Sequence, residues 1–147
     1  MDKAEMAPIV IGKLMNIGGM LQKRANLMLA PFQLNQQQYS ILFSIYQEDR
    51  VQQKNVINKL MLEKAHVSKV VKKLHSMDLI DIELSEQDKR SSWLMITDKG
   101  KKLVHKVRGV SADWNKQWTG ELDMNQMNQL LESLTMIQNV FKEKALH

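Results

Sequence analysis

The 147-residue sequence contains no cysteine, which removes several kinds of chemistry at once. A chain without thiols has no disulfide framework, no thiol nucleophile, no cysteine-ligated metal centre and no cysteine redox switch. Two prolines and six glycines leave little room for linkers or low-complexity segments. The longest apolar runs, residues 6–11 and 27–32, fall far short of the roughly 20 residues that a membrane-spanning helix needs.

Asp2 and Glu5 stand where a signal peptide would carry basic residues, so no secretion signal is expected. A chain of this length and ordinary composition is long enough to bury one cooperative core. We therefore expect residues 1–147 to form a single domain that works in the cytoplasm.

Positive charge is concentrated in the middle of the chain, although the formal net charge is only +5. Residues 54–75 hold six lysines against one glutamate, and residues 98–108 hold five basic residues against one aspartate. Acidic residues outnumber basic ones over 120–147. This distribution indicates a contact surface for a polyanion, while its plainer interpretation is a set of solvated helix faces.

Apolar residues at helical spacing dominate the first half of the chain. They predict a helix over 7–29 and a second helix that begins after Asn35, a favourable N-cap residue. A short helix is expected over 53–61 and a longer one over 64–77, joined by a tight turn at residues 62–63. The sequence thus predicts two consecutive helices in the arrangement of a helix-turn-helix.

A different apolar period follows, with Ile80, Ile82 and Leu84 alternating with polar residues as in a half-buried strand. A polar turn over 86–92 and a returning strand over 93–96 complete a predicted β-hairpin.

The remaining segments are a connector and two helices. Residues 47–50 are expected to form a polar connector, Thr97 can cap the next helix, and the last helix follows Gly120. One side of that last helix is apolar, with these residues: Met127, Leu130, Leu131, Leu134, Ile137 and Phe141.

The helix predicted over 64–77 has the two faces that DNA recognition requires. Val67, Val70, Val71 and Leu74 form an apolar stripe, while the opposite face is small, polar and basic. A helix anchored in this way can enter the major groove, and a basic hairpin beyond it can reach phosphates or the minor groove. An α+β domain with lysines that merely aid solubility is the alternative.

Several segments resemble the MarR family of winged-helix bacterial transcription regulators. The resemblance is densest over 34–103: it begins with LNQQQY at 34–39 and continues through the helix-turn-helix at 55–74. Asp88-Lys89-Arg90 is similar to the Asp-x-Arg motif of the family's wing. The segment ITDKG at 96–100 is similar to the end of that wing.

The resemblance implies a mainly α fold with a small β-hairpin wing. Residues 34–98 would form the winged helix-turn-helix lobe, and residues 1–33 and 99–147 a helical dimerisation lobe. Three positions depart from the family pattern: Met61 and Asp78 replace common glycines, and Ala65 replaces a frequent Ser or Thr. Met61 predicts a turn of altered length or shape, whereas Asp tolerates the left-handed conformation.

The resemblance also implies site residues for double-stranded DNA. The predicted recognition face comprises Ala65, His66, Ser68, Lys69 and Lys72. In the wing, Lys89 and Arg90 would contact DNA and Asp88 would support Arg90, while Lys54, Lys64 and Lys73 would contact phosphates, which position the protein but do not specify sequence.

The same resemblance implies a homodimer on a pseudo-palindromic operator, acting as a repressor. Many relatives bind small aromatic effectors, and the positions that could line such a pocket here are Met20, Arg24, Tyr39, Phe43 and Trp93. The four histidines have no ligand spacing, so no metal or other cofactor is expected.

Two other kinds of function stay open at this point. A small enzyme is disfavoured because no P-loop, dinucleotide fingerprint, HExxH or GxSxG motif is present. A winged-helix protein that works mainly through protein contacts is disfavoured by the lysine-rich face and Arg90.

Overall fold

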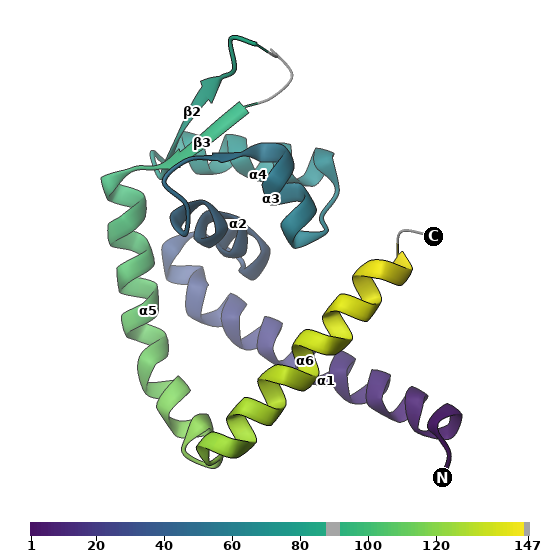
Figure 1. Ribbon diagram of the computed structural model, residues 1–147. Helices are drawn as coiled ribbons and strands as arrows, with labels where there is room; N and C mark the ends of the chain where they lie inside the picture. The colour runs from purple at the N-terminus through teal and green to yellow at the C-terminus, as the bar shows by residue number, and fades with distance from the viewer. Residues whose placement is uncertain (88–91, 146–147) are drawn as a thin grey trace. The chain divides into compact units, whose positions relative to one another are not determined.

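The structure, a computed structural model, describes residues 1–87 and 92–145 of the chain. Helices dominate it, and Figure 1 shows their order along the chain. The elements are α1 (Lys3–Leu29), the 3-10 helix η1 (Ala30–Phe32), α2 (Gln36–Tyr46), β1 (Val51–Gln52), α3 (Gln53–Leu60), α4 (Lys64–Ser76), β2 (Ile80–Leu84), β3 (Ser92–Ile96), α5 (Asp98–Thr119) and α6 (Met124–Ala145). Two compact units, Met1–Arg108 and Gly109–His147, divide the chain within α5.

Reciprocal capping boxes fix the starts of two helices in the first unit. Asn35 accepts a hydrogen bond from the Gln38 backbone while the Gln38 side chain accepts one from the Asn35 backbone, which confirms Asn35 as the N-cap of α2. Asp2 and Glu5 form the same arrangement at α1. The predicted start of the first helix at residue 7 was therefore wrong, because this cap begins α1 at Lys3.

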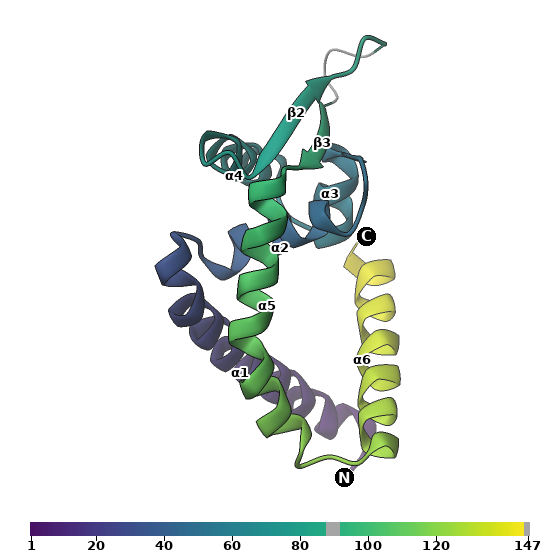
Figure 2. The ribbon, with the colours of Figure 1, turned by 90° about the vertical axis from the view of Figure 1, so that its left-hand side faces the viewer.

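The sheet has three antiparallel strands in the order β1-β3-β2. The hairpin of β2 and β3 was expected, and Figure 2 shows it as a ribbon that extends past α3 and α4. The strand β1 was not expected. It pairs Val51 with Leu94 and is only two residues long, too short to leave an alternating pattern in the sequence.

The alternation along β2 buries fewer residues than predicted. Ile80 is buried and Ile82 is half-buried, but Leu84 is 64% exposed. Leu84 is the last residue of β2 before the turn, where it pairs with Ser92 of β3.

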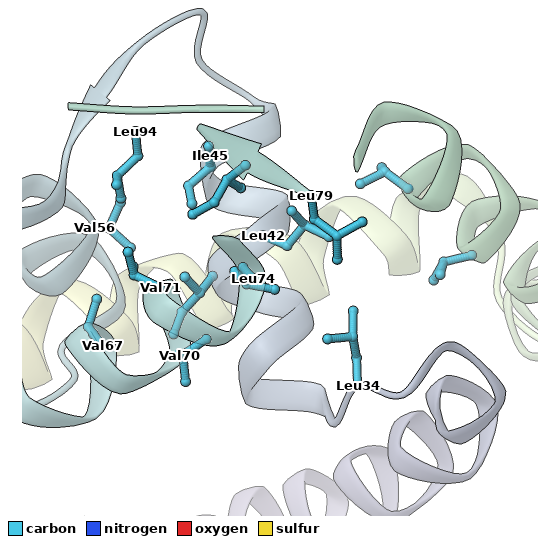
Figure 3. Close-up of a cluster of buried hydrophobic side chains, with 14 of the residues drawn as sticks. Leu34, Leu42, Ile45, Val56, Val67, Val70, Val71, Leu74, Leu79 and Leu94 are labelled. Carbon is cyan, nitrogen blue, oxygen red and sulfur yellow. The ribbon is translucent and has the colours of Figure 1, made fainter. Parts of the chain in front are cut away.

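The core of the first unit lies where α2, α4 and the sheet meet (Figure 3). Its fully buried side chains come from nearly every element of that unit: Leu29, Ile41, Leu42, Ile45, Val56, Val67, Leu74, Leu79, Ile80, Leu94, Val104 and Val107. The apolar stripe predicted for α4 is therefore its inward face.

The turn between α3 and α4 keeps the tight shape that a glycine would give. Met61 has φ 53° and ψ 42°, the left-handed conformation, and its N–H donates to the Ile57 carbonyl. The altered turn predicted from this substitution is thus not observed, because Met61 adopts the strained conformation itself. Asp78 likewise has φ 60°, as its tolerance of that region predicted.

Thr97 joins the end of α4 to the start of α5. Its hydroxyl donates to the Asp78 carbonyl at 2.7 Å and accepts from the Gly100 N–H at 3.0 Å, so it caps α5 as expected. An ideal Cβ on Gly100 would meet the Leu79 carbonyl oxygen and lie 2.6 Å from Ile96 Cγ1. Only glycine allows α5 to approach Leu79 and β3 this closely.

Within residues 1–87 and 92–145, no helix combines the length and the apolar character that crossing a membrane would require. Asp88, Lys89 and Arg90, predicted to form the wing tip, lie outside the residues that the structure describes.

Candidate nucleic-acid interface

Helix α4 is held by its apolar stripe, which leaves the opposite face free to meet another molecule. Val67 and Leu74 are fully buried, and Val70 and Val71 are 3% exposed. Helix α3 packs beside α4 and contributes buried Val56, while α2 packs against α4 as well. This is the anchoring that a recognition helix needs.

The outer face of α4 contains the five predicted recognition residues. Ala65, Lys69 and Lys72 are exposed, whereas His66 and Ser68 are half-buried. Neither Lys69 nor Lys72 hydrogen-bonds or pairs with another described residue, so both ammonium groups are available to an anion. The structure therefore leaves three of the five residues exposed and two half-buried.

Gln53, the first residue of α3, is a polar neighbour that the sequence interpretation missed. Its Nε2 donates to Ser68 Oγ at 2.9 Å, which joins α3 to the outer face of α4. A glutamine amide retains a second N–H and a carbonyl oxygen, the pair that can bind adenine. The signal in the sequence was its position at the start of the first helix of a predicted helix-turn-helix.

His66 lies differently from the other members of the predicted face. Its Nε2 is buried and has no hydrogen-bond partner among the described residues. In this orientation Nε2 cannot reach a base, so His66 would need another rotamer to read DNA through that atom.

The three predicted phosphate contacts fall into two groups. Lys54 and Lys64 are exposed, and neither has a partner among the described residues. Lys73 is engaged within the chain, because its Nζ donates to the Gln33 carbonyl at 2.9 Å and to Gln38 Oε1 at 3.1 Å.

Close to the turn end of the paired strands, one arginine contacts both strands of the hairpin. Arg50, next to β1, forms an ion pair with Glu83 of β2 at 3.3 Å, and its guanidinium carbon lies 4.4 Å from the ring centroid of Trp93 on β3. The pair is solvent-exposed, so we expect it to orient the hairpin more than to stabilise the fold.

The five predicted effector residues are not brought together. Tyr39 and Phe43 stack in a row with Tyr46 along α2, with centroid distances of 6.0 and 5.8 Å, and His105 of α5 meets Tyr46 edge-on. Trp93 instead lies against Arg50 and lines a pocket of about 320 Å³ to which none of the other four contributes. Met20 is 69% exposed on α1, the same helix that carries Arg24.

Burial raises the pKa of the Tyr39 phenol above its usual value, against the smaller opposing effect of the Arg108 charge. The phenol is neutral at physiological pH, as an ordinary tyrosine is, and can donate a hydrogen bond. Among residues 1–87 and 92–145, no three His, Asp or Glu side chains are grouped closely enough to hold a metal ion.

Two helices joined by a tight turn, a basic outer face on the second helix and a following three-stranded antiparallel sheet define a winged helix-turn-helix protein. Residues 34–92 match the sequence model of the MarR family. The helix-turn-helix and hairpin segment of the chain is therefore similar to the MarR family, and the curated proteins that the chain matches are HTH-type transcriptional regulators.

The similarity to individual proteins is modest in sequence and close in fold. The chain is 20% identical to the regulator BilQ of Clostridioides difficile over 76% of each protein. It is 29% identical to MgrA of Staphylococcus aureus, where the match spans 59% of each protein. A mutant of the Escherichia coli protein MarR, solved with operator DNA, has the same fold: the TM-score is 0.75 at 18% identity over 93% of this chain and 99% of that one.

Proposed function

We propose that the chain represses transcription as a homodimer on a pseudo-palindromic operator in double-stranded DNA. The observation that carries the proposal is the outer face of α4, where Lys69 and Lys72 are exposed and have no partner among the described residues, on a helix anchored by its buried stripe. Such a helix fits a major groove about 12 Å wide. A protein of the same fold has been solved with operator DNA, which supports DNA as the partner of this chain.

In this proposal the outer face reads the bases. Lys69 and Lys72 donate to base acceptors and to neighbouring phosphate oxygens, the Ala65 methyl contacts a thymine methyl, and Ser68 acts together with Gln53. His66 borders the same face. Because no arginine is present on it to bind guanine through two hydrogen bonds, we expect modest discrimination at each position.

Sequence-independent contacts add affinity. Lys54 and Lys64 are proposed to contact phosphates from either side of the α3–α4 turn. Arg90 is proposed to enter the minor groove beside Lys89, with Asp88 holding its guanidinium. The ion pair of Arg50 with Glu83 supports the hairpin that carries these three residues.

Exposed apolar side chains support the homodimer. In α1 they include Met6, Ile9, Val10, Ile11, Met15, Ile17, Met20, Leu21 and Leu27. In α6 they are Met124, Leu130, Leu131, Leu134, Met136, Val140 and Phe141. Apolar surface of this extent marks an interaction site. A two-fold dimer would set two α4 helices about one DNA turn apart.

The aromatic row of Tyr39, Phe43 and Tyr46 is the feature that supports a small aromatic effector. Its rings can stack on another ring, and the neutral Tyr39 phenol can donate to a carboxylate or phenolate. A titration of operator-bound protein with benzoate and phenol tests this part. The compounds should release the protein from the operator, and this release should require Tyr39 and Phe43. Release that persists in Tyr39→Leu and Phe43→Leu would contradict it.

Selection of bound duplexes from a random library tests the proposal as a whole. We expect an enriched inverted repeat whose half-sites are about 10 base pairs apart. Sedimentation of the free protein at micromolar concentration should give a dimer. A folded monomer, or a library with no enriched duplex, would refute the proposal, and the second result would favour a winged-helix protein that acts through protein contacts. Reporter repression in bacterial cytoplasm would then test the direction of regulation.

A further inference from the structure

We propose that Lys73 is a positioning residue, which ties recognition helix α4 to the junction of α1 and α2, and that it does not contact a phosphate. Its Nζ donates to two acceptors on that junction, the Gln33 carbonyl at 2.9 Å and Gln38 Oε1 at 3.1 Å. Lys72, the preceding residue, has no partner among the described residues. The inference rests on the proposed function, since positioning matters to DNA only if α4 reads it.

The acceptors of Lys73 are themselves held in place. Gln38 Oε1 also accepts from the Asn35 N–H at 3.0 Å, as part of the capping box that starts α2. Gln33 ends η1 in the left-handed conformation, φ 62°, with its N–H bonded to the Ala30 carbonyl. The lysine therefore binds acceptors that are already in place, so only the lysine side chain itself has to be ordered when the bonds form.

The cradle also connects to α1. Asn26 Oδ1 of α1 accepts from the Gln36 N–H at 2.7 Å, and Leu34 beside Gln33 is buried in the core together with Leu29. A change in how α1 meets α2 would move Gln33 and Gln38, and Lys73 would pass that movement to α4. We infer that this contact connects the helix proposed to dimerise with the helix proposed to read DNA.

The two roles of Lys73 predict different salt dependence. A lysine that neutralises a phosphate contributes about 0.9 to the slope of log affinity against log salt. A lysine that only orients α4 changes affinity for the selected operator without changing that slope. Lys73→Met should therefore raise the operator Kd about three- to tenfold and leave the slope unchanged. This loss of affinity has the size that one hydrogen bond contributes.

Lys72→Met is the matched control, because it removes the same charge one residue away on the same helix. We expect it to lower the slope of log affinity against log salt by about 0.9, the contribution of one neutralised phosphate. Lys73→Arg keeps both the charge and the donors and should restore most of the operator affinity. Circular dichroism and urea unfolding confirm that each variant is folded before its affinity is compared.

A double-mutant cycle of Lys73→Met with Gln38→Met isolates the contact. Gln38 lies outside α4, yet Gln38→Met should weaken operator binding, and Lys73→Met should then weaken it by less than it does in the wild-type chain, since only the bond to the Gln33 carbonyl is left to lose. Additive reductions in affinity, or a slope that falls by about 0.9 in Lys73→Met in both backgrounds, would overturn the proposal in favour of a phosphate contact.

The same cycle measured by urea unfolding without DNA separates this inference from the proposed function. If the wild-type chain enriches no duplex, the proposed function fails. The hydrogen bond between Lys73 and Gln38 is still supported if the double variant loses less in its unfolding midpoint than the two single variants lose together. If the midpoint losses of the two single variants add up in the double variant, the contact between Lys73 and Gln38 is refuted, whether or not the chain binds DNA.

Discussion

Gln53 Nε2 and Ser68 Oγ lie 2.9 Å apart in a hydrogen bond that joins the first residue of α3 to the outer face of α4. The bond orients both side chains toward each other at the edge of the proposed groove-binding surface. It leaves the Gln53 carbonyl oxygen and one N–H for other partners.

If Gln53 reads a base, Gln53→Ala should lower affinity and relax sequence preference at one operator position, with a loss of roughly 1–3 kcal/mol at that base pair. Ser68→Ala should relax the same position because it frees the Gln53 amide. Library selection with each variant measures the preference. A general loss of affinity with unchanged preference would contradict base reading by Gln53.

Lys69→Ala and Lys72→Ala should each weaken operator binding. They should also flatten the slope of log affinity against log salt by about one unit for each phosphate that the protein no longer neutralises. Lys116, exposed in the C-terminal half of α5, provides the control: Lys116→Ala should leave both quantities unchanged. Unchanged affinity and slope in both α4 variants would refute the proposal that the outer face of α4 contacts DNA.

Arg90→Ala should weaken operator binding by about tenfold or more, since a specific arginine contact is worth roughly 1–3 kcal/mol. Its unfolding midpoint should stay at the wild-type value. Gel shifts and urea unfolding together provide the check, and full binding by the variant would count against the wing.

Gly100→Ala should destabilise the first unit by about 1–3 kcal/mol, because a Cβ would strike the Leu79 carbonyl and Ile96. Gly109, also in α5, has no atom within 4 Å of an ideal Cβ. Gly109→Ala should therefore stabilise the helix by about 0.5–1 kcal/mol. Urea unfolding measures both variants, and equal effects would refute the close approach at Gly100.

Met61→Gly should stabilise the chain by up to about 1 kcal/mol, since glycine adopts φ 53° without the cost that Met61 bears. The side chain is 53% exposed, so its removal sacrifices little packing. Met61→Ala retains the strained conformation and should give no gain. Thermal unfolding of the two variants tests the difference.

Local patterns in the sequence were enough to predict most elements of the first unit. The valine stripe of α4, the Asn35 cap and the Thr97 cap depend on residues close together in the chain, and each is found as expected. Strand β1 was missed because two residues carry no period, and Leu84 was placed inward because alternation does not reveal where a hairpin leaves the core.

The sequence by itself determined the resemblance to the MarR family, the basic outer face of α4 and the absence of thiol chemistry, because these depend on residue identity and spacing. Tertiary structure decided which lysines are free. Lys69, Lys72 and Lys73 look alike in the sequence, yet only Lys73 meets Gln33 and Gln38, 40 and 35 residues away. The same holds for Gln53 and Ser68, and for the buried Nε2 of His66. A side chain's partners depend on the packing of distant segments, which no local pattern records.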